Sequence, residues 1–322
     1  MPKKTITKFS VFVIFIVFVS ISSGACHSNV VGGGEPPSFD RAKSLYDEPK
    51  VVGKIESTEI TESSGIAVSK CQQEVIWTHN DSEDGAFIFA LNSTGKALGT
   101  WRVPNARNVD WEDMAGYKNS NGKCYLYVGD IGNTNNNERS EHKIYRIPEP
   151  AVNESDSGAT RKDPIQTEPA ETLTFSYPDA RQDAETLMVH PASGEIYIVT
   201  KHRSSPAGVY KLKPVFDAAV VKADKISDLT VPAIPNGFLT GGDIAHDGKH
   251  LIVSDYFAAY EFTLPADSGN FDDIWKQKPV VVELGERKQG EAIGYAEDGL
   301  SIYATSEGKL APLIEAKRRK QK

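Results

Sequence analysis

The chain has 322 residues, enough for one large domain or two ordinary ones. Apolar residues make up 39% and aromatic residues 9%, so the chain can form a buried core and is not disordered throughout. The net charge of −8 argues against nucleic acid as a partner, because binding to phosphates needs a basic surface. Positive charge is concentrated at 317–322, which we expect to be a solvated basic tail, with contact to an anionic surface as the alternative.

The N-terminus has the pattern of a secretory signal. Three lysines open the chain, and the apolar stretch 9–21 that follows is too short to span a bilayer. Small residues at 23–25 supply a cleavage site. Residues 1–25 are therefore predicted to be a signal peptide that directs export.

Cys26 directly follows the small residues, an arrangement that resembles a bacterial lipoprotein signal. It predicts lipidation of Cys26, with attachment to the membrane only through that anchor. Ordinary signal cleavage remains the alternative, because Ser23 stands where lipoprotein signals usually carry an aliphatic residue. We thus expect a cell-envelope lipoprotein, or a secreted protein if Cys26 is not modified. The glycines and prolines of residues 26–49 predict a flexible tether.

From residue 50 onward, one phrase recurs five times. An acidic residue precedes a short apolar strand, and a second apolar strand ends at a polar residue. The first strands follow Glu62, Glu112, Glu185, Asp243 and Glu291, and the second strands end at Asn80, Asp130, Lys201, Asp255 and Glu307. A repeat of about 40–50 residues made only of strands and turns is typical of a β-propeller.

The first four repeats each divide into four predicted strands. The first holds 65–69, 75–79, 86–91 and 97–103; the second holds 113–117, 125–129, 143–147 and 172–176. The third holds 186–190, 196–200, 208–212 and 227–231; the fourth holds 244–246, 250–254, 259–263 and 280–284. The fifth holds 292–295, 301–305 and 312–315, and lacks an outer strand.

An unassigned strand at 50–55 completes the fifth repeat if the ring closes, which removes the exposed edges. The predicted fold is therefore all-β, a single propeller of five four-stranded blades over residues 50–316. The stretch 148–169, rich in Pro, Glu, Ser, Asp and Thr, is read as a loop of the second repeat, but a degenerate sixth blade is the alternative.

Two cysteines remain besides Cys26. Cys71 and Cys124 each lie just before the second strand of consecutive repeats, so both fall on the same face of neighbouring blades. An oxidising compartment permits a disulfide between them if their Cα atoms approach within about 7 Å. Two unpaired thiols in adjacent loops are the alternative.

The acidic residues of the repeat are predicted to meet. In a propeller blade the first strand lines the channel and the second returns antiparallel, so the start of one and the end of the other lie at the same mouth. Lys201 is the single cation at an equivalent position. Carboxylates gathered in this way repel one another and lose hydration. The expected members are Glu112, Glu185, Asp243, Glu291, Asn80, Asp130, Asp255 and Glu307.

A hard divalent cation would relieve that repulsion, and calcium accepts about 6–8 oxygen ligands in flexible geometry. The alternatives are pairing with basic side chains or backbone amides, or a wide channel filled by water. A metal site and a purely structural network both remain open.

Known catalytic signatures are missing: the sequence has no G-x-S-x-G, H-E-x-x-H, Cys-x-x-Cys, G-x-x-x-x-G-K-[ST] or G-x-G-x-x-G motif. Asp130, Glu307 and His79 are candidate general bases beside a bound cation. Trp111 beside the acids could stack on a sugar ring, although such a residue more often packs between blades.

The phrases GGDIAHDGKHLIVSD and GEAIGYAEDGLSIYATSEG resemble blades of gluconolactonase (regucalcin-like) and phytase-like propellers. The motifs NDS (80–82), DWED (110–113) and GDIG (129–132) resemble a family of secreted bacterial propellers largely without assigned activity, over about residues 60–310. Asn133 stands where that pattern has Asp. The resemblance implies a calcium site with Glu112, Glu185 and Glu291 as ligands, supported by Asn80, Asp130 and Asp243.

Two hypotheses follow. The first is an exported, monomeric, cation-binding propeller whose mouth binds a small molecule, carbohydrate or peptide, with calcium-dependent hydrolysis of an ester, lactone or phosphoester. The second is a non-catalytic binding or scaffold propeller of the cell envelope. Fold alone does not choose between them, because propellers serve both purposes.

Overall fold

The computed structural model describes residues 36–82, 84–133, 139–217 and 219–320. The predicted signal peptide and Cys26 lie outside these residues. In the described part of the chain, no helix is long and apolar enough to cross a membrane.

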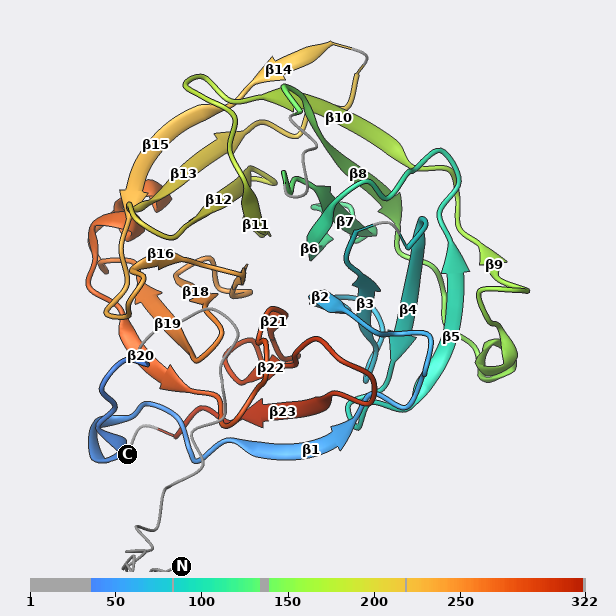
Figure 1. The fold of residues 1–322 in the computed structure, drawn as a ribbon, viewed down its shortest axis with the longest axis horizontal. Helices are drawn as coiled ribbons and strands as arrows, with labels where there is room; N and C mark the ends of the chain where they lie inside the picture. Colours follow the sequence, from blue (N-terminus) through green and yellow to red (C-terminus); the bar gives the residue numbers. More distant parts are fainter. Residues whose placement is uncertain (1–35, 83, 134–138, 218, 321–322) are drawn as a thin grey trace, which may run out of the picture.

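The described strands form five sheets around one axis, with β2, β6, β11, β17 and β21 innermost (Figure 1). Blade 1 contains β2 (Ser63–Val68), β3 (Ile76–Asn80), β4 (Phe87–Leu91) and β5 (Ala97–Arg102). Blade 2 contains β6 (Trp111–Lys118), β7 (Cys124–Asp130), β8 (His142–Pro148) and β10 (Glu171–Ser176). Blade 3 contains β11 (Ala184–Val189), β12 (Ile196–His202), β13 (Ala207–Leu212) and β15 (Asp224–Leu229).

Blade 4 contains β17 (Gly241–Ile244), β18 (His250–Ser254), β19 (Ala258–Thr263) and β20 (Val280–Glu283). Blade 5 contains β21 (Ile293–Tyr295), β22 (Ile302–Ala304) and β23 (Pro312–Ala316), and β1 (Lys50–Lys54) pairs antiparallel with β23 at its outer edge. The predicted five-bladed propeller and its closure by an N-terminal strand are confirmed. The pairing satisfies the backbone groups that an open ring would leave at the edge of blade 5.

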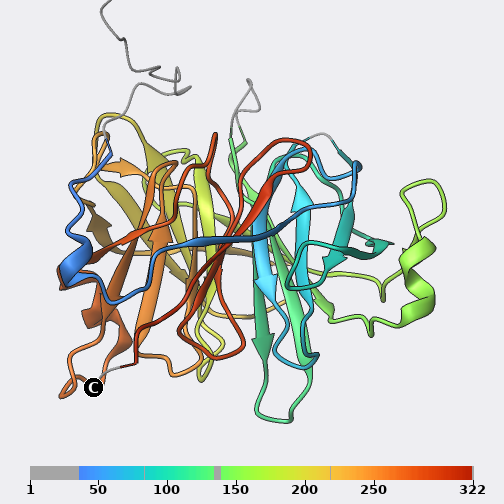
Figure 2. The same cartoon turned by 90° about the horizontal axis from the view of Figure 1, so that it is seen from below.

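Residues 148–169 do not form a sixth blade. They contain the 3-10 helix η2 (Glu154–Gly158) and the short strand β9 (Ile165–Gln166), which pairs parallel with β5 on the outside of blade 1. Figure 2 shows this excursion projecting from the side of the ring. A similar strand, β14 (Val220–Lys222), pairs parallel with β10 on blade 2.

Apolar side chains fill the spaces between blades. Trp77 and Trp101 of blade 1 are fully buried with ring centroids 5.0 Å apart, and they belong to a cluster that continues into blade 2. Close packing of these buried apolar residues between the blades holds the inner strands in fixed positions. The polar ends of those strands are therefore presented rigidly at the mouth of the channel.

The segments that precede and follow the propeller in the sequence also pack against it. Tyr46, in the segment expected to be a tether, is 2% exposed and its hydroxyl donates to Glu261 Oε1 at 2.5 Å. Arg318, in the expected basic tail, pairs with the buried Glu261 and donates to the Tyr46 hydroxyl at 3.0 Å. Two short 3-10 helices, η1 (Arg41–Lys43) and η3 (Phe271–Lys276), complete the described helices.

Candidate functional site

Carboxylates from three blades gather at one mouth of the channel. Asp81, Asp110 and Glu112 form one group, and Glu112, Asp183 and Glu185 form a second; within each group the oxygens lie within 4.8 Å of one another. Asp81 follows β3, whereas Asp110 and Asp183 precede the inner strands β6 and β11. Glu112 belongs to both groups, so it joins them into one acidic cluster.

Local bulges position the two glutamates. The pairing of β6 with β7 shifts between Trp111 and Met114, and the pairing of β11 with β12 shifts between Ala184 and Thr186. A bulge inserts an extra residue and redirects side chains, a device often found next to functional sites. Glu112 and Glu185 lie at these equivalent irregularities, which is why both reach the same place.

Gly132 makes room for the cluster. A Cβ atom at this position would lie 2.0 Å from Glu112 Oε1 and 2.7 Å from Asp110 Oδ2. No residue with a side chain fits there without displacing both carboxylates. The second glycine of the GDIG sequence therefore has a direct role in the geometry of the site.

Lys201 supplies one positive charge to this mouth. Its Nζ donates to Glu185 Oε1 at 2.5 Å and lies 4.0 Å from Glu291 Oε1. The other oxygens, Glu185 Oε2 and Glu291 Oε2, are buried and have no hydrogen-bond partner in the described structure. Glu307 contacts Glu291 and adds negative charge beside it. Among the described residues, Glu112 makes no ion pair.

Burial and mutual repulsion raise the pKa values of these acids. Burial, and then the charges of Glu185 and Asp81, hold the pKa of Glu112 well above its usual range. Burial, and then Glu185 and Glu307, do the same to the pKa of Glu291. Burial raises the pKa of Asp81 to about 8 and that of Glu185 to about 7, although Lys201 partly offsets the effect on Glu185. Without added positive charge, the cluster therefore favours bound protons.

Lys201 itself remains charged. Burial opposes its ammonium charge, but the carboxylates of Glu185 and Glu291 more than compensate and raise its pKa. Its single charge only partly offsets the effect of burial on the pKa of Glu185.

Two of the predicted ligands are already occupied by protein contacts. Asn80 Oδ1 accepts the backbone N–H groups of Thr61 and Glu62 at 2.8 and 3.1 Å, and its Nδ2 donates to Glu59 O and Asp84 Oδ2. Asp130 Oδ1 accepts from the N–H of Asp110 at 2.9 Å and from Arg139 at 2.7 Å. The structure assigns both side chains to holding loops at the mouth.

Asp243 lies elsewhere. The strand expected at 244–246 begins instead at Gly241, so Asp243 is inside β17 rather than ahead of it. Its carboxylate accepts from Tyr295 N at 2.9 Å and lies 3.9 Å from Lys70, which follows the far end of β2. The structure therefore separates Asp243 from Glu112, Glu185 and Glu291, because blade 4 begins with two glycines where blades 2 and 3 carry acids.

His79 is enclosed in the core. It is fully buried, its Nδ1 donates to the backbone oxygen of Asn80 at 2.9 Å, and its ring meets Trp111 edge-on at 5.6 Å. Burial lowers its pKa to about 4. Trp111 is likewise buried and donates to Arg107 O, so it packs between blades and is not exposed for stacking on a ligand.

Asp255 also serves the fold. Its carboxylate accepts from the Tyr260 hydroxyl at 2.6 Å and from the N–H groups of Phe257 and Ala258 at 2.8 Å each.

Asp110 and Asp183 were not among the expected ligands. A signal for them is present: each stands two positions before the glutamate of its blade, giving Asp-x-Glu at 110–112 and again at 183–185. Reading that spacing as a repeat would have identified both.

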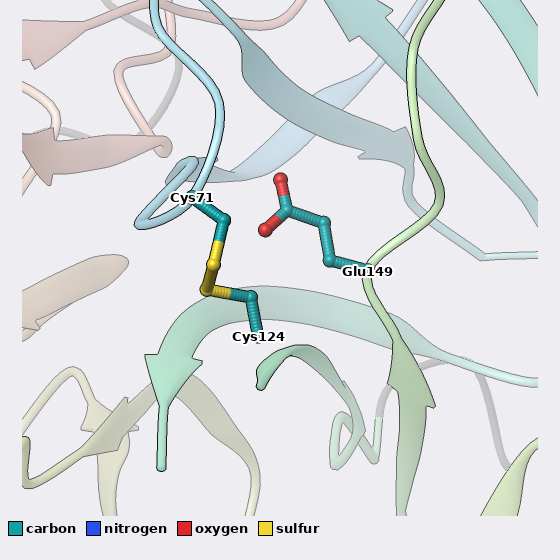
Figure 3. A group of neighbouring side chains, drawn as sticks. All are labelled: Cys71, Cys124 and Glu149. Carbon is teal, nitrogen blue, oxygen red and sulfur yellow. A yellow bond between two sulfur atoms is a disulfide. The ribbon is translucent and has the colours of Figure 1, made fainter. Parts of the chain in front are cut away.

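Figure 3 shows a further group, Cys71, Cys124 and Glu149. Cys71 and Cys124 form a disulfide, with Cα atoms 6.2 Å apart, that joins blades 1 and 2. Glu149 Oε1 accepts from Trp77 Nε1 at 2.9 Å and from Gln72 Nε2 at 3.0 Å. Since bonded sulfurs offer no thiolate and the carboxylate is hydrogen-bonded, this group has a structural role.

A pocket of about 290 Å³ adjoins the acidic cluster. It is lined by Asp183, Glu185, Lys201, Arg203 and Phe238. The site thus combines carboxylates with a neighbouring space bounded by two cations and one aromatic ring.

Comparisons with known proteins identify structural neighbours. The sequence matches no family profile and no curated protein. A gluconolactonase from Xanthomonas campestris is 12% identical with a TM-score of 0.44, over 88% of this chain and 95% of that one. A luciferin-regenerating enzyme is 9% identical with a TM-score of 0.44, over 84% of this chain and 95% of that one. Both neighbours are β-propellers.

The acid pKa values predict how stability depends on pH without divalent cations. The folded state retains protons on Asp81 and Glu185 that the unfolded state releases, so the free energy of unfolding falls as pH rises through about 7 and 8. Histidines with lowered pKa values change the free energy of unfolding only below about pH 6.5, so they do not contribute to this fall. In EDTA, we expect the thermal midpoint to fall by a few degrees from about pH 6.5 to about pH 8.5.

Asp81→Asn should make that fall shallower, whereas Asp267→Asn, at an exposed acid, should leave it unchanged. Thermal unfolding followed by circular dichroism across the pH range measures both. A midpoint that rises with pH in the parent protein would contradict the assignment.

Proposed function

We propose that the protein is a divalent-cation-binding propeller, with calcium held in the acidic cluster at the mouth of the channel. The observation that carries this proposal is a pair of buried oxygens without hydrogen-bond partners, Glu185 Oε2 and Glu291 Oε2. They lie beside the acidic cluster formed by the two sets of three carboxylates described above. A buried oxygen without a partner costs about 1–3 kcal/mol, and more when the group is charged. A bound cation would remove that cost.

The donor set suits calcium. Carboxylate oxygens are hard ligands, and calcium takes about 6–8 of them at about 2.3–2.6 Å. Glu112 and Glu185 would be the central ligands, with Asp110, Asp183 and Asp81 around them and Glu291 on the side of Lys201. The rigid inner strands hold these side chains, and Gly132 keeps the space beside Glu112 free of a side chain.

Hydrolysis of an ester, lactone or phosphoester is the chemistry that we propose for the site. A divalent cation bound there would polarise the substrate oxygen and stabilise negative charge that develops on it. The pocket beside Glu185 would hold the substrate. Of the three candidate bases, Asp130 is paired with Arg139 and His79 is sealed in the core. Glu307 remains, half-buried and in contact with Glu291, to accept a proton from water at its carboxylate.

A non-catalytic scaffold of the cell envelope is the second candidate. It is favoured by the acids that hold blades together, of which Asp113 is the clearest. Asp113 Oδ2 accepts from Leu187 N on blade 3 and from Gly242 N on blade 4. Export, and a lipid anchor at Cys26, belong to either candidate and remain proposals.

Calcium should stabilise the chain from residue 27 onward, because a ligand that binds only the folded state must raise its stability. At a concentration 100 times the dissociation constant, the gain is about 2.7 kcal/mol. Glu112→Gln should abolish the rise in thermal midpoint, since Glu112 belongs to both carboxylate groups. Glu168→Gln, at an exposed position between β9 and β10, is the matched control and should respond like the parent. Equal responses of the two variants would show that calcium does not bind at this cluster.

Hydrolysis is tested with a panel of lactones, carboxylic esters and phosphoesters. We expect turnover of at least one class with calcium and its loss in EDTA. Glu307→Gln should lower kcat by about 100-fold or more, as expected for loss of a general base, while calcium still raises the thermal midpoint. Calcium binding with no turnover of any class would favour the scaffold candidate.

A further inference from the structure

The pocket beside the acidic cluster is lined by side chains of both charges. Two of them are acids, Asp183 and Glu185, and the others are Lys201, Arg203 and Phe238. The short strand β16 (Gly237–Phe238) pairs antiparallel with the end of β12, with Phe238 opposite Lys201. This pairing places the backbones of Phe238 and Lys201 side by side and holds them by backbone hydrogen bonds.

The two cations that line the pocket differ in their partners. Lys201 is held by Glu185, and its Nζ lies 4.6 Å from the centre of the Phe238 ring. Arg203 lies over the same ring at 4.8 Å, and among the described residues its guanidinium has no carboxylate partner. An exposed arginine stacked on an aromatic ring keeps its planar donors available for an oxyanion.

Charge decides when an anion can enter. Lys201 and Arg203 offset Asp183 and Glu185 within the pocket, but Glu112, Asp110 and Glu291 stand just behind it. When these carboxylates are ionised and have no added positive charge beside them, they repel a free oxyanion. A divalent cation at the cluster adds two positive charges next to the pocket and reverses that balance.

We propose that this pocket binds an organic oxyanion, a carboxylate or a phosphate, and that it does so only together with the divalent cation. The oxyanion would lie between the cation and the guanidinium of Arg203, with the organic part against Phe238. Arg203 is then the residue that selects anionic ligands. This inference rests on the proposed function, because it needs a cation in the cluster.

Thermodynamic linkage makes the proposal quantitative: if calcium tightens anion binding, the anion must tighten calcium binding by the same factor. The probes are benzoate and phenyl phosphate, which distinguish the two oxyanions, with benzyl alcohol as the neutral control. Isothermal titration of the chain from residue 27 measures each probe with calcium and with EDTA, and calcium with and without each probe.

We expect benzoate or phenyl phosphate to bind at least tenfold more tightly with calcium than in EDTA, and benzyl alcohol to show no such dependence. Arg203→Ala should weaken anion binding at least tenfold, while calcium still binds in the absence of the probe. Arg203→Lys should restore part of it, because a lysine keeps the charge and loses the planar donor pair. Arg102→Ala, at an exposed arginine of β5 on blade 1, is the matched control for net charge and should bind like the parent.

The outcomes separate the two proposals. Calcium binding with no anion binding, or with equal effects of Arg203→Ala and Arg102→Ala, overturns the oxyanion pocket and leaves the cation site standing. Anion binding that is equally tight in EDTA overturns the coupling. Absence of calcium binding overturns the proposed function and this inference with it.

Discussion

Several carboxylates are buried together at one mouth of the propeller channel, and the properties of the candidate site depend on that burial. Each loses hydration, and each raises the pKa of its neighbours, as Glu112 and Glu291 show most clearly. Lys201 returns only part of that cost through Glu185. The fold holds these side chains in place and does not let them turn to solvent. The site therefore favours a bound positive charge. That preference is the physical basis of the proposed cation site.

Polar residues of the first and second strands of the blades divide into two sets. Asn80, Asp130, Asp113 and Asp243 have their oxygens on backbone N–H groups, an arginine or a lysine, and so connect blades and loops. Glu112, Glu185 and Glu291 have oxygens that no such group satisfies in the described structure, or lack an ion pair altogether. Only the second set has free coordinating capacity. The polar residues of the repeat thus connect blades at some positions, and at others they are the ligands of the proposed cation site.

The sequence was sufficient for the blade number and for ring closure because both follow from the strand repeat and from a strand left over at the N-terminus. It also located Glu112, Glu185 and Glu291. It failed at Asp243, since the start of blade 4 depends on Gly241 and Gly242 continuing the strand backwards, which residue type alone does not indicate. Asp183 is marked only by the Asp-x-Glu spacing that 183–185 shares with 110–112, and its approach to Glu112 depends on contact between blades. Whether an acid is satisfied depends on contacts across blades, which no local pattern records.

A crystal structure of the chain grown with calcium, phased to show the anomalous signal of the ion, tests the central claim most directly. The account predicts one strong peak at about 2.3–2.6 Å from carboxylate oxygens of both Glu112 and Glu185. The side chain of Glu291 should also be ordered, with Oε2 in contact with the ion or with a water bound to the ion. A map with no peak at the mouth, and with Lys201 still the only positive group beside Glu185 and Glu291, would contradict the account.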